Sequence, residues 1–318
     1  MRIGIIGCGT IAATYVQALE RLPEQYQITA LYDICPENAH ALSVPNAKVC
    51  SGIAELTDLP QVDGVIVSTP VHTHTSVAEQ CLRKKKHVLM EKPATLSVTE
   101  LTGLYRLAWE MGVMFHVAFH ASFGVDIDWY LEHLGACDPV YSKEKIQSVT
   151  CRFYDPYMPD GEILEDRKAL GGSYIDSGVN ILSVCSRLIP LESLALQRHA
   201  VKTAPDGVTY ASETVLCSEK TTVTMYTGWD KGQNHKSTEL RFYTAENILL
   251  LDHTDQSVRM VAPDGKEELL YRETCGERMV NQYVRVFEVF YHVLQTRLVE
   301  EHKNQALTVH KLLLDNIC

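Results

Sequence analysis

The sequence predicts an α/β protein with two domains. The N-terminal domain is expected to hold a doubly wound parallel sheet, because short apolar β-rich runs alternate with helical patterns over the first ~118 residues. The C-terminal domain is expected to be α+β with a large, open, mainly antiparallel sheet, because β-rich segments there are separated by Asn, Asp, Gly and Pro. We place the domains at 1–120 and 121–318, and the C-terminal helices can pack back on the first domain.

The elements of the first domain follow from apolar periodicity and capping residues. Val65, Ile66 and Val67 form an uninterrupted apolar run, which is typical of a buried parallel strand. Ser97 and Glu100 have the spacing of a capping box at a helix start. Strands are expected at Arg2–Ile6, Gln27–Tyr32, Val62–Ser68, His87–Met90 and Met114–Ala118. Helices are expected at Thr10–Leu22, Thr73–Arg83 and from Ser97 to Met111.

The second domain is expected to begin and end with helices around its sheet. The first helix is placed at Asp126–Leu134, and the last at Arg278–Glu300 with Val280, Val284, Phe287 and Tyr291 on its apolar face. Strands are expected at Ile146–Phe153, Ala195–Val201, Thr209–Cys217, Thr221–Thr227, Glu239–Tyr243, Ile248–Leu251 and Ser257–Val261.

Composition excludes several classes of protein. The 318 residues carry a formal net charge of −11, which argues against general binding to nucleic acids or anionic membranes. No stretch approaches the ~20 consecutive apolar residues of a membrane span. The ten cysteines form no C-x-x-C pair and are expected to be reduced thiols, Cys318 included. We therefore expect a cytoplasmic protein that acts on a small molecule.

A glycine-rich turn joins the first expected strand to the first expected helix. Its residues are Gly7, Cys8, Gly9, Thr10, Ile11 and Ala12, the G-x-G-x-x-A form of the dinucleotide-binding fingerprint of Rossmann domains. Asp33 ends the second strand, where a carboxylate accepts the hydroxyls of the adenosine ribose and repels a 2′-phosphate. This pattern favours NAD over NADP as the cofactor. The alternative is that Asp33 only caps the helix that opens at Pro36.

Two further strand ends supply candidate cofactor contacts. The carboxyl ends of parallel strands form the ligand crevice of such sheets. The candidates there are Ser68, Thr69, Pro70, His74, Glu91 and Lys92. The alternative interpretations are an ordinary strand-to-helix turn after Ser68 and an exposed lysine at a strand end.

Asp176 and Asn180 form the second candidate cluster. They are four residues apart, so a helix places them on one face, and apolar residues surround them. A buried carboxylate needs a partner, and a lysine from the other domain would serve. We therefore predict that Lys92 and Asp176 meet in an interdomain cleft. The alternative is that Asp176 only stabilises the helix macrodipole.

Together these motifs resemble the Gfo/Idh/MocA oxidoreductases. The resemblance covers nearly the whole chain and rests on Gly7–Ala12, Ser68-Thr69-Pro70, Glu91-Lys92-Pro93 and the step from Gly171-Gly172 to Asp176. It implies an oligomer, a homodimer or homotetramer, formed through the C-terminal sheet. Most members carry His where Asn180 stands, so the chain looks more like the aldose 1-dehydrogenase branch, which oxidises L-arabinose or D-galactose and often accepts NADP. His120 matches a sugar-contacting histidine of that branch.

The function expected from these residues is hydride transfer between carbon 1 of an aldose and NAD(P). Lys92 is expected to accept the hydroxyl proton, Asp176 to orient Lys92, and Asn180 to hold the hydroxyl. Two alternatives remain open: reaction at a ring carbon of a polyol, inositol or nucleotide-linked sugar, and a non-catalytic dinucleotide-binding sensor.

Further sugar contacts are expected at His120, Tyr154 and Asp155, besides Asp176 and Asn180. The polar loop Trp229–Lys236 can also reach a sugar, although a plain hairpin is an equal alternative. No metal site is expected, because the histidines follow no zinc-ligand spacing.

Overall fold

The computed structural model describes residues 1–296 and 299–315. Within these residues the chain forms two compact units. The first unit contains Met1–His120 and Met279–His310, and the second contains Ala121–Arg278 and the described part of Lys311–Cys318. The nine cysteines in the described residues are free thiols, and Cys318 lies outside them.

The first unit is built on a six-stranded parallel sheet, as predicted. The strand order is β3-β2-β1-β4-β5-β6, so β2 and β3 follow on one side of β1, and the order then reverses with β4 to β6 on the other side. Such a reversal leaves a crevice at the carboxyl ends of β1 and β4, where ligands of doubly wound folds bind. The strands are β1 (Arg2–Ile6), β2 (Gln27–Tyr32), β3 (Lys48–Val49), β4 (Gly64–Val67), β5 (His87–Glu91) and β6 (Phe115–Ala118).

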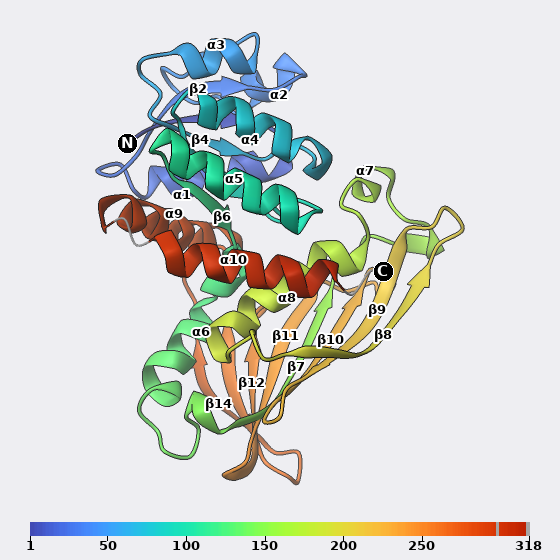
Figure 1. The fold of residues 1–318 in the computed structure, drawn as a ribbon. Coiled ribbons are helices and arrows are strands. Elements are labelled where there is room, and N and C mark those ends of the chain that lie inside the picture. Colours follow the sequence, from blue (N-terminus) through green and yellow to red (C-terminus); the bar gives the residue numbers. More distant parts are fainter. Residues whose placement is uncertain (297–298, 316–318) are drawn as a thin grey trace. The chain divides into compact units, whose positions relative to one another are not determined.

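Helices flank this sheet (Figure 1). They are α1 (Thr10–Glu20), α2 (Pro36–Ala41), α3 (Ile53–Asp58), α4 (His74–Arg83), α5 (Val98–Met111), α9 (Arg278–Thr296) and α10 (Val299–Leu314). At the start of α5, the Ser97 hydroxyl accepts the Glu100 N–H at 3.3 Å, as the capping box predicts. A capping box also implies a bond from the Ser97 N–H to the Glu100 carboxylate, and that prediction is wrong. The Ser97 N–H donates to the Thr95 hydroxyl, and the Glu100 carboxylate accepts from the Thr75 hydroxyl at 2.8 Å.

Helix α9 shows where periodicity misplaced a buried face. Val280 and Phe287 are buried as predicted, but Val284 and Tyr291 are only half-buried. The rest of the buried face is Gln282, Tyr283, Val286, Phe290 and Val293. The expected helix Arg278–Glu300 is described only to Thr296, because residues 297–298 lie outside the described residues, and α10 follows as a helix that was not predicted.

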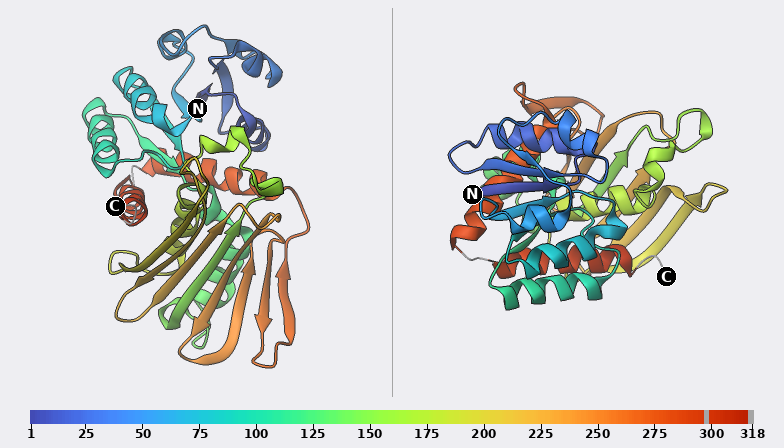
Figure 2. Two further views of the ribbon diagram at one scale, coloured as in Figure 1. Left: turned by 90° about the vertical axis from the view of Figure 1, so that its right-hand side faces the viewer. Right: turned by 90° about the horizontal axis from the view of Figure 1, so that it is seen from above.

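The second unit contains an eight-stranded sheet in the order β14-β13-β12-β11-β7-β10-β9-β8 (Figure 2). Every neighbouring pair is antiparallel except β7 and β10, so the prediction of a mainly antiparallel sheet is confirmed. Strand β14 was not predicted, and β11 begins four residues earlier than expected. The strands are β7 (Ile146–Tyr154), β8 (Ala195–Thr203), β9 (Thr209–Cys217), β10 (Thr222–Gly228), β11 (His235–Phe242), β12 (Ala245–Asp252), β13 (Ser257–Val261) and β14 (Glu267–Arg272).

Helices α6 (Val125–Tyr130) and α8 (Ser173–Leu188) pack on this sheet, α8 over β7, β9 and β10 and α6 over β12 to β14. A π-helical turn at Leu131–Gly135 continues α6, and the short α7 (Glu165–Lys168) precedes α8. Alternate residues of β7 are buried, namely Val149, Cys151 and Phe153, and the Cys151 and Cys185 sulfurs lie 4.0 Å apart between β7 and α8. The residues between them face the other side of the sheet.

Candidate functional site

The glycine turn between β1 and α1 is shaped by two glycines with different roles. Gly7 has a φ of +92°, and a Cβ there would lie 2.7 Å from the backbone of Ser68, so only glycine fits. The Ser68 hydroxyl donates to the Gly7 carbonyl at 2.8 Å. Gly9 differs, because no described heavy atom lies within 4 Å of an added Cβ.

Gly9 and Thr10 are exposed at the start of α1, and no described side chain caps this helix. The first N–H groups and the positive end of the helix dipole are therefore available to an anion. This arrangement fits the pyrophosphate of a dinucleotide. The roles predicted for Cys8, Ile11 and Ala12 stay predictions; Cys8 and Ala12 are buried beneath the turn.

Asp33 joins the glycine turn to the following helix. One carboxylate oxygen accepts the Cys8 N–H at 2.7 Å, and the other accepts the Cys35 N–H at 2.9 Å and the Asn38 side-chain amide at 3.1 Å. The carboxylate thus organises the start of α2, as the alternative interpretation expects, and also fixes the turn. Its contact with a ribose stays a prediction.

His74 connects the ends of two strands. One ring nitrogen lies 2.7 Å from the Thr69 carbonyl oxygen, and the other lies 3.1 Å and 3.2 Å from the carbonyl oxygens of Pro93 and Ala94. Burial lowers the pKa of His74, so the neutral ring, which has one N–H, is favoured. The loop that carries Ser68, Thr69 and Pro70 is therefore packed beside the loop that carries Lys92.

Glu91 lies at the end of β5 and is buried. One of its oxygens accepts the hydroxyls of Tyr15 from α1, at 2.6 Å, and of Tyr283 from α9, at 2.5 Å. The other oxygen accepts the Lys92 backbone N–H at 3.0 Å. Burial raises the pKa of Glu91, although the two tyrosine hydroxyls oppose this shift. Glu91 therefore holds the backbone of Lys92 against two helices, and its predicted contact with the cofactor stays a prediction.

His120 belongs to the same part of the first unit. Its ring stacks on Tyr283 with centroids 5.1 Å apart, and one ring nitrogen lies 3.1 Å from the Gln282 amide oxygen. Tyr15 and Tyr283 were not predicted as site residues. Both lie on expected helices, but nothing in their spacing indicates that they share one carboxylate.

In the second unit, the structure places Asp176 and Asn180 in α8, where both are buried. The Asn180 side-chain amide donates to the Asp176 carbonyl at 3.3 Å. The Asn180 amide oxygen is buried and has no hydrogen-bond partner among the described residues. A buried acceptor without a partner is costly, and a ligand hydroxyl would satisfy it.

Asp155 forms an ion pair that the sequence analysis did not predict. The Lys236 ammonium lies 2.5 Å from one Asp155 oxygen and 2.8 Å from the Asn234 amide oxygen. The Ser177 hydroxyl, next to Asp176 in α8, donates to the other Asp155 oxygen at 3.3 Å. Burial lowers the pKa of Lys236, although Asp155 opposes this shift. The only signal for Lys236 was its place at the end of the polar loop Trp229–Lys236.

Tyr154 is not brought together with these residues. Along β7 it alternates with Phe153, which is buried, and so faces the side of Arg152, whose guanidinium lies over the Tyr226 ring. Asp155 instead contacts α8 through Ser177. The predicted sugar contact of Tyr154 therefore stays a prediction without support from this arrangement.

Two aromatic residues lie close to Asp155. Trp229 is fully buried and packs edge-on against Tyr157 with ring centroids 5.6 Å apart. Its indole N–H has no hydrogen-bond partner within the described ranges. Burial raises the pKa of Tyr157, and the charges of Asp155 and Asp176 raise it further. Both carboxylates therefore act on the same tyrosine.

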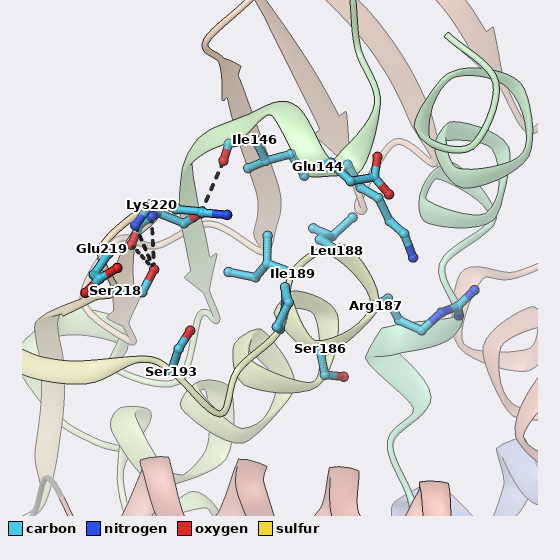
Figure 3. Close-up of a pocket in the computed structure, with 13 residues that line it drawn as sticks. Glu144, Ile146, Ser186, Arg187, Leu188, Ile189, Ser193, Ser218, Glu219 and Lys220 are labelled. Carbon is cyan, nitrogen blue, oxygen red and sulfur yellow. Dashed lines mark hydrogen bonds between the residues drawn. The ribbon is translucent and has the colours of Figure 1, made fainter. Parts of the chain in front are cut away.

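A separate hollow lies at the C-terminal end of α8, whereas Asp176 lies near the start of this helix (Figure 3). Its volume is about 780 Å³, and it contains none of the predicted site residues. The Arg187 guanidinium at its edge is held by the Ser122 carbonyl at 2.8 Å and by Asp128 at 2.9 Å. This hollow is therefore distinct from the cluster around Asp155 and Asp176.

The described residues contain neither a metal-binding cluster nor a membrane-spanning helix. No group of three or more His, Cys, Asp or Glu side chains in residues 1–296 and 299–315 is placed to hold a metal ion. Over the same ranges, no helix combines the length and the apolar character needed to cross a membrane.

The first part of the chain matches a known protein family. Residues 1–119 match the Gfo/Idh/MocA model, which describes an oxidoreductase family with an NAD-binding Rossmann fold. For residues 1–119 this match confirms the family predicted from the motifs. The aldose 1-dehydrogenase branch stays a prediction.

Two curated relatives show how far the similarity extends. The scyllo-inositol 2-dehydrogenase (NADP(+)) IolW of Bacillus subtilis is 32% identical over 117 residues, which are 37% of this chain and 32% of that protein. The chain thus spans about a third of the length of this relative. The dTDP-3,4-didehydro-2,6-dideoxy-alpha-D-glucose 3-reductase of Streptomyces violaceoruber is 27% identical over 285 residues, 84% of this chain and 79% of that protein.

A solved structure resembles both units. A variant of KijD10, a 3-ketoreductase from Actinomadura kijaniata in complex with TDP-benzene and NADP, superimposes with a TM-score of 0.80. The match covers 98% of this chain and 95% of that chain at 20% sequence identity. At this identity the likeness establishes the fold.

Proposed function

We propose that this chain, whose residues 1–119 belong to the Gfo/Idh/MocA oxidoreductase family, is an NAD(P)-dependent oxidoreductase that acts on a ring carbon of a sugar or cyclic polyol. The observation that carries the proposal is the place of Lys92. It follows β5 directly, at the carboxyl edge of the sheet, in a domain of a dinucleotide-binding oxidoreductase family. A lysine at that edge can hydrogen-bond a hydroxyl or carbonyl oxygen that reacts there.

The relatives favour a ring carbon over carbon 1. The inositol dehydrogenase is named for a reaction at position 2, and the dTDP-sugar reductase and the ketoreductase for reactions at position 3. Oxidation of an aldose at carbon 1 is the second candidate. It is favoured by Asn180, which stands where most family members carry His.

The roles proposed for the chain's residues are proton transfer and positioning. A bound nicotinamide would supply the hydride chemistry. Lys92 holds the reacting oxygen by a hydrogen bond and takes up or returns its proton, and the Glu91 carboxylate keeps the Lys92 backbone in place. In the second unit, Asp176 accepts from a substrate hydroxyl, and the free amide oxygen of Asn180 accepts from another.

NAD is the preferred dinucleotide in this proposal. Asp33 keeps a negative charge beside the glycine turn, where a 2′-phosphate would be repelled. Ile34, which follows it, is exposed and carries no charge to attract that phosphate. Because IolW is named as an NADP(+) enzyme and KijD10 was solved with NADP, both dinucleotides belong in the test.

The test measures dinucleotide reduction by the full chain with NAD or NADP and a panel of polyols: myo-inositol, scyllo-inositol, D-glucose, D-galactose and L-arabinose. Lys92→Met is expected to lower turnover by about 10²–10⁴-fold, the usual effect of losing an acid–base group. Lys85→Met, which alters an exposed lysine of the same unit, is the matched control. Undiminished turnover in Lys92→Met would refute the role of Lys92.

The product separates the remaining candidates. A ketose or inosose supports reaction at a ring carbon, whereas a lactone that opens to an aldonic acid supports reaction at carbon 1. Tight dinucleotide binding without turnover of any polyol would favour a non-catalytic sensor instead.

We also propose a homodimer or homotetramer formed through the sheet of the second unit, which the family resemblance implies. Leu196 and Val201 are exposed on its edge strand β8. Light scattering after size-exclusion chromatography measures the mass, and a monomer would refute this proposal.

A further inference from the structure

The Lys236–Asp155 pair is unusual because both charged side chains are nearly buried. Their side chains are 10% and 9% exposed, and the two atoms that face each other lie 2.5 Å apart. Removing two charges from water costs more than an ion pair usually returns, and apolar replacements of such pairs are often neutral or stabilising. Stability alone is therefore a weak reason for this chain to keep the pair.

The pair also has unused hydrogen-bonding capacity. A lysine ammonium has three donors, and the contacts with Asp155 and Asn234 account for two of them. A carboxylate has about four acceptor positions, and Lys236 and Ser177 occupy two of those of Asp155. Among the described residues, one donor of Lys236 and at least one acceptor position of Asp155 thus have no partner.

Two buried polar groups lie on segments that contact Asp155. The Asn180 amide oxygen, one helical turn beyond Asp176, is a buried acceptor with no partner in the part of the chain that the structure describes. The Trp229 indole N–H is a buried donor that also has no partner among the described residues. Trp229 is tied to this loop, because its carbonyl accepts the Met158 N–H at 3.2 Å. A ligand rich in hydroxyl groups would satisfy both.

We propose that Lys236 and Asp155 together recognise two adjacent hydroxyl groups of the substrate. Lys236 donates to the oxygen of one hydroxyl, and Asp155 accepts from the neighbouring hydroxyl. Lys236 is thereby a specificity-determining residue that selects a vicinal diol. This inference rests on the proposed function only in taking a sugar or cyclic polyol as the ligand.

The charges around the pair suit a neutral diol. The Arg278 guanidinium interacts with Asp155, but also with Asp126 and Asp252, and the Lys236 ammonium is paired with Asp155. Because the charged groups already have partners of opposite sign, the site favours hydroxyl groups over a further ionic group. Hydrogen bonds between a hydroxyl and a charged group are the stronger kind, so each missing hydroxyl is expected to weaken binding measurably.

The test measures equilibrium binding by calorimetry, which does not require turnover. The probes are myo-inositol, D-glucose and the 2-, 3- and 4-deoxy forms of D-glucose, each added to the full chain with NADH present, because the reduced dinucleotide cannot accept a hydride from them. In the unaltered chain, two deoxy sugars that lack neighbouring hydroxyls are each expected to bind about 10- to 100-fold more weakly than D-glucose. In Lys236→Met, D-glucose and one of these two deoxy sugars are expected to bind equally, because the donor that distinguished them is gone.

Two further variants keep the test sound. The double variant Asp155→Asn with Lys236→Met removes both charges, so it folds without an unpaired buried charge and is expected to lose the same discrimination. Lys266→Met alters an exposed lysine of the same unit, outside the loop Trp229–Lys236, and is expected to keep this discrimination. A purely structural pair would change the melting temperature without changing the ratio between the two sugars.

The outcomes separate this inference from the proposed function. Retained discrimination in both Lys236 variants, or failure of both D-glucose and myo-inositol to bind the unaltered chain, overturns the inference. Hydroxyl-dependent binding without any dinucleotide reduction would overturn the proposed function and leave the inference standing.

Discussion

Two substitutions in the glycine turn separate folding from cofactor binding. In Gly7→Ala, the new Cβ would lie 2.7 Å from the Ser68 carbonyl group and 2.8 Å from the Thr69 nitrogen, at a φ of +92°. A left-handed alanine costs about 1–2 kcal/mol, and overpacking against the backbone of the neighbouring strand about 1–3 kcal/mol more. We therefore expect the free energy of unfolding of the first unit to fall by about 2–5 kcal/mol.

Gly9→Ala is the matched comparison. Gly9 has a φ of −74° and open space around it, so alanine is tolerated and the free energy of unfolding is expected to change by less than about 1 kcal/mol. The added methyl instead occupies the space where a pyrophosphate would approach the start of α1. The affinity for NADH is therefore expected to fall by about tenfold or more, the factor that about 1.4 kcal/mol represents.

Both variants are measured by denaturant unfolding and by NADH fluorescence titration. The expected pattern is opposite in the two: Gly7→Ala loses stability, and Gly9→Ala loses NADH affinity while keeping stability. The reasoning is refuted if Gly7→Ala unfolds within about 0.5 kcal/mol of the unaltered chain, the usual range for harmless surface changes. Unchanged NADH affinity in Gly9→Ala would show that the pyrophosphate does not lie at this turn.

Three further predictions concern single side chains. Asp33→Asn removes the charge but keeps an acceptor oxygen, so the ratio of kcat/KM with NADP to that with NAD is expected to rise by about 10-fold or more, and an unchanged ratio contradicts the role of Asp33. In the folded chain, burial raises the pKa of Glu91 above its unfolded value of about 4.3. The protonated carboxyl therefore contributes stability below a pH of about 4.3, and this contribution is lost as the pH rises through the folded-state pKa. Urea unfolding at several pH values should therefore show the unaltered chain losing stability relative to Glu91→Gln as pH rises, and a constant difference would contradict this. Ser97→Ala removes the cap of α5 and is expected to lower the free energy of unfolding by about 1 kcal/mol, whereas no change in thermal unfolding would mean that the cap is not formed.

The sequence by itself determined the local features of this protein. Strand β1 and strand β2 have the predicted bounds, and the turn at Gly7 adopts the positive φ that its motif requires. These features depend on residues that are neighbours along the chain, so apolar periodicity and conformational preference suffice to predict them. The spacing of Asp176 and Asn180 also predicted that one helix carries both residues, and α8 does so.

Apolar periodicity predicted the structure less well where tertiary packing decides which residues are buried. The buried face of α9 includes Tyr283 and Phe290 in place of Val284 and Tyr291. The side chains that pack against the helix decide which of its faces is buried, and sequence periodicity does not identify them. Strand β14 was missed, since its residues are mostly exposed and lack a clear alternation.

Only the tertiary structure decided which polar groups meet. Glu91 is held by Tyr15 and Tyr283, which are 76 and 192 residues away along the chain. Asp155 pairs with Lys236 across 81 residues, whereas Tyr154, its direct neighbour, faces the other side of the sheet. Such contacts follow from the order and register of strands and helices, and no local pattern encodes them. That is the physical reason why the glycine turn could be read from the sequence and the ion pair could not.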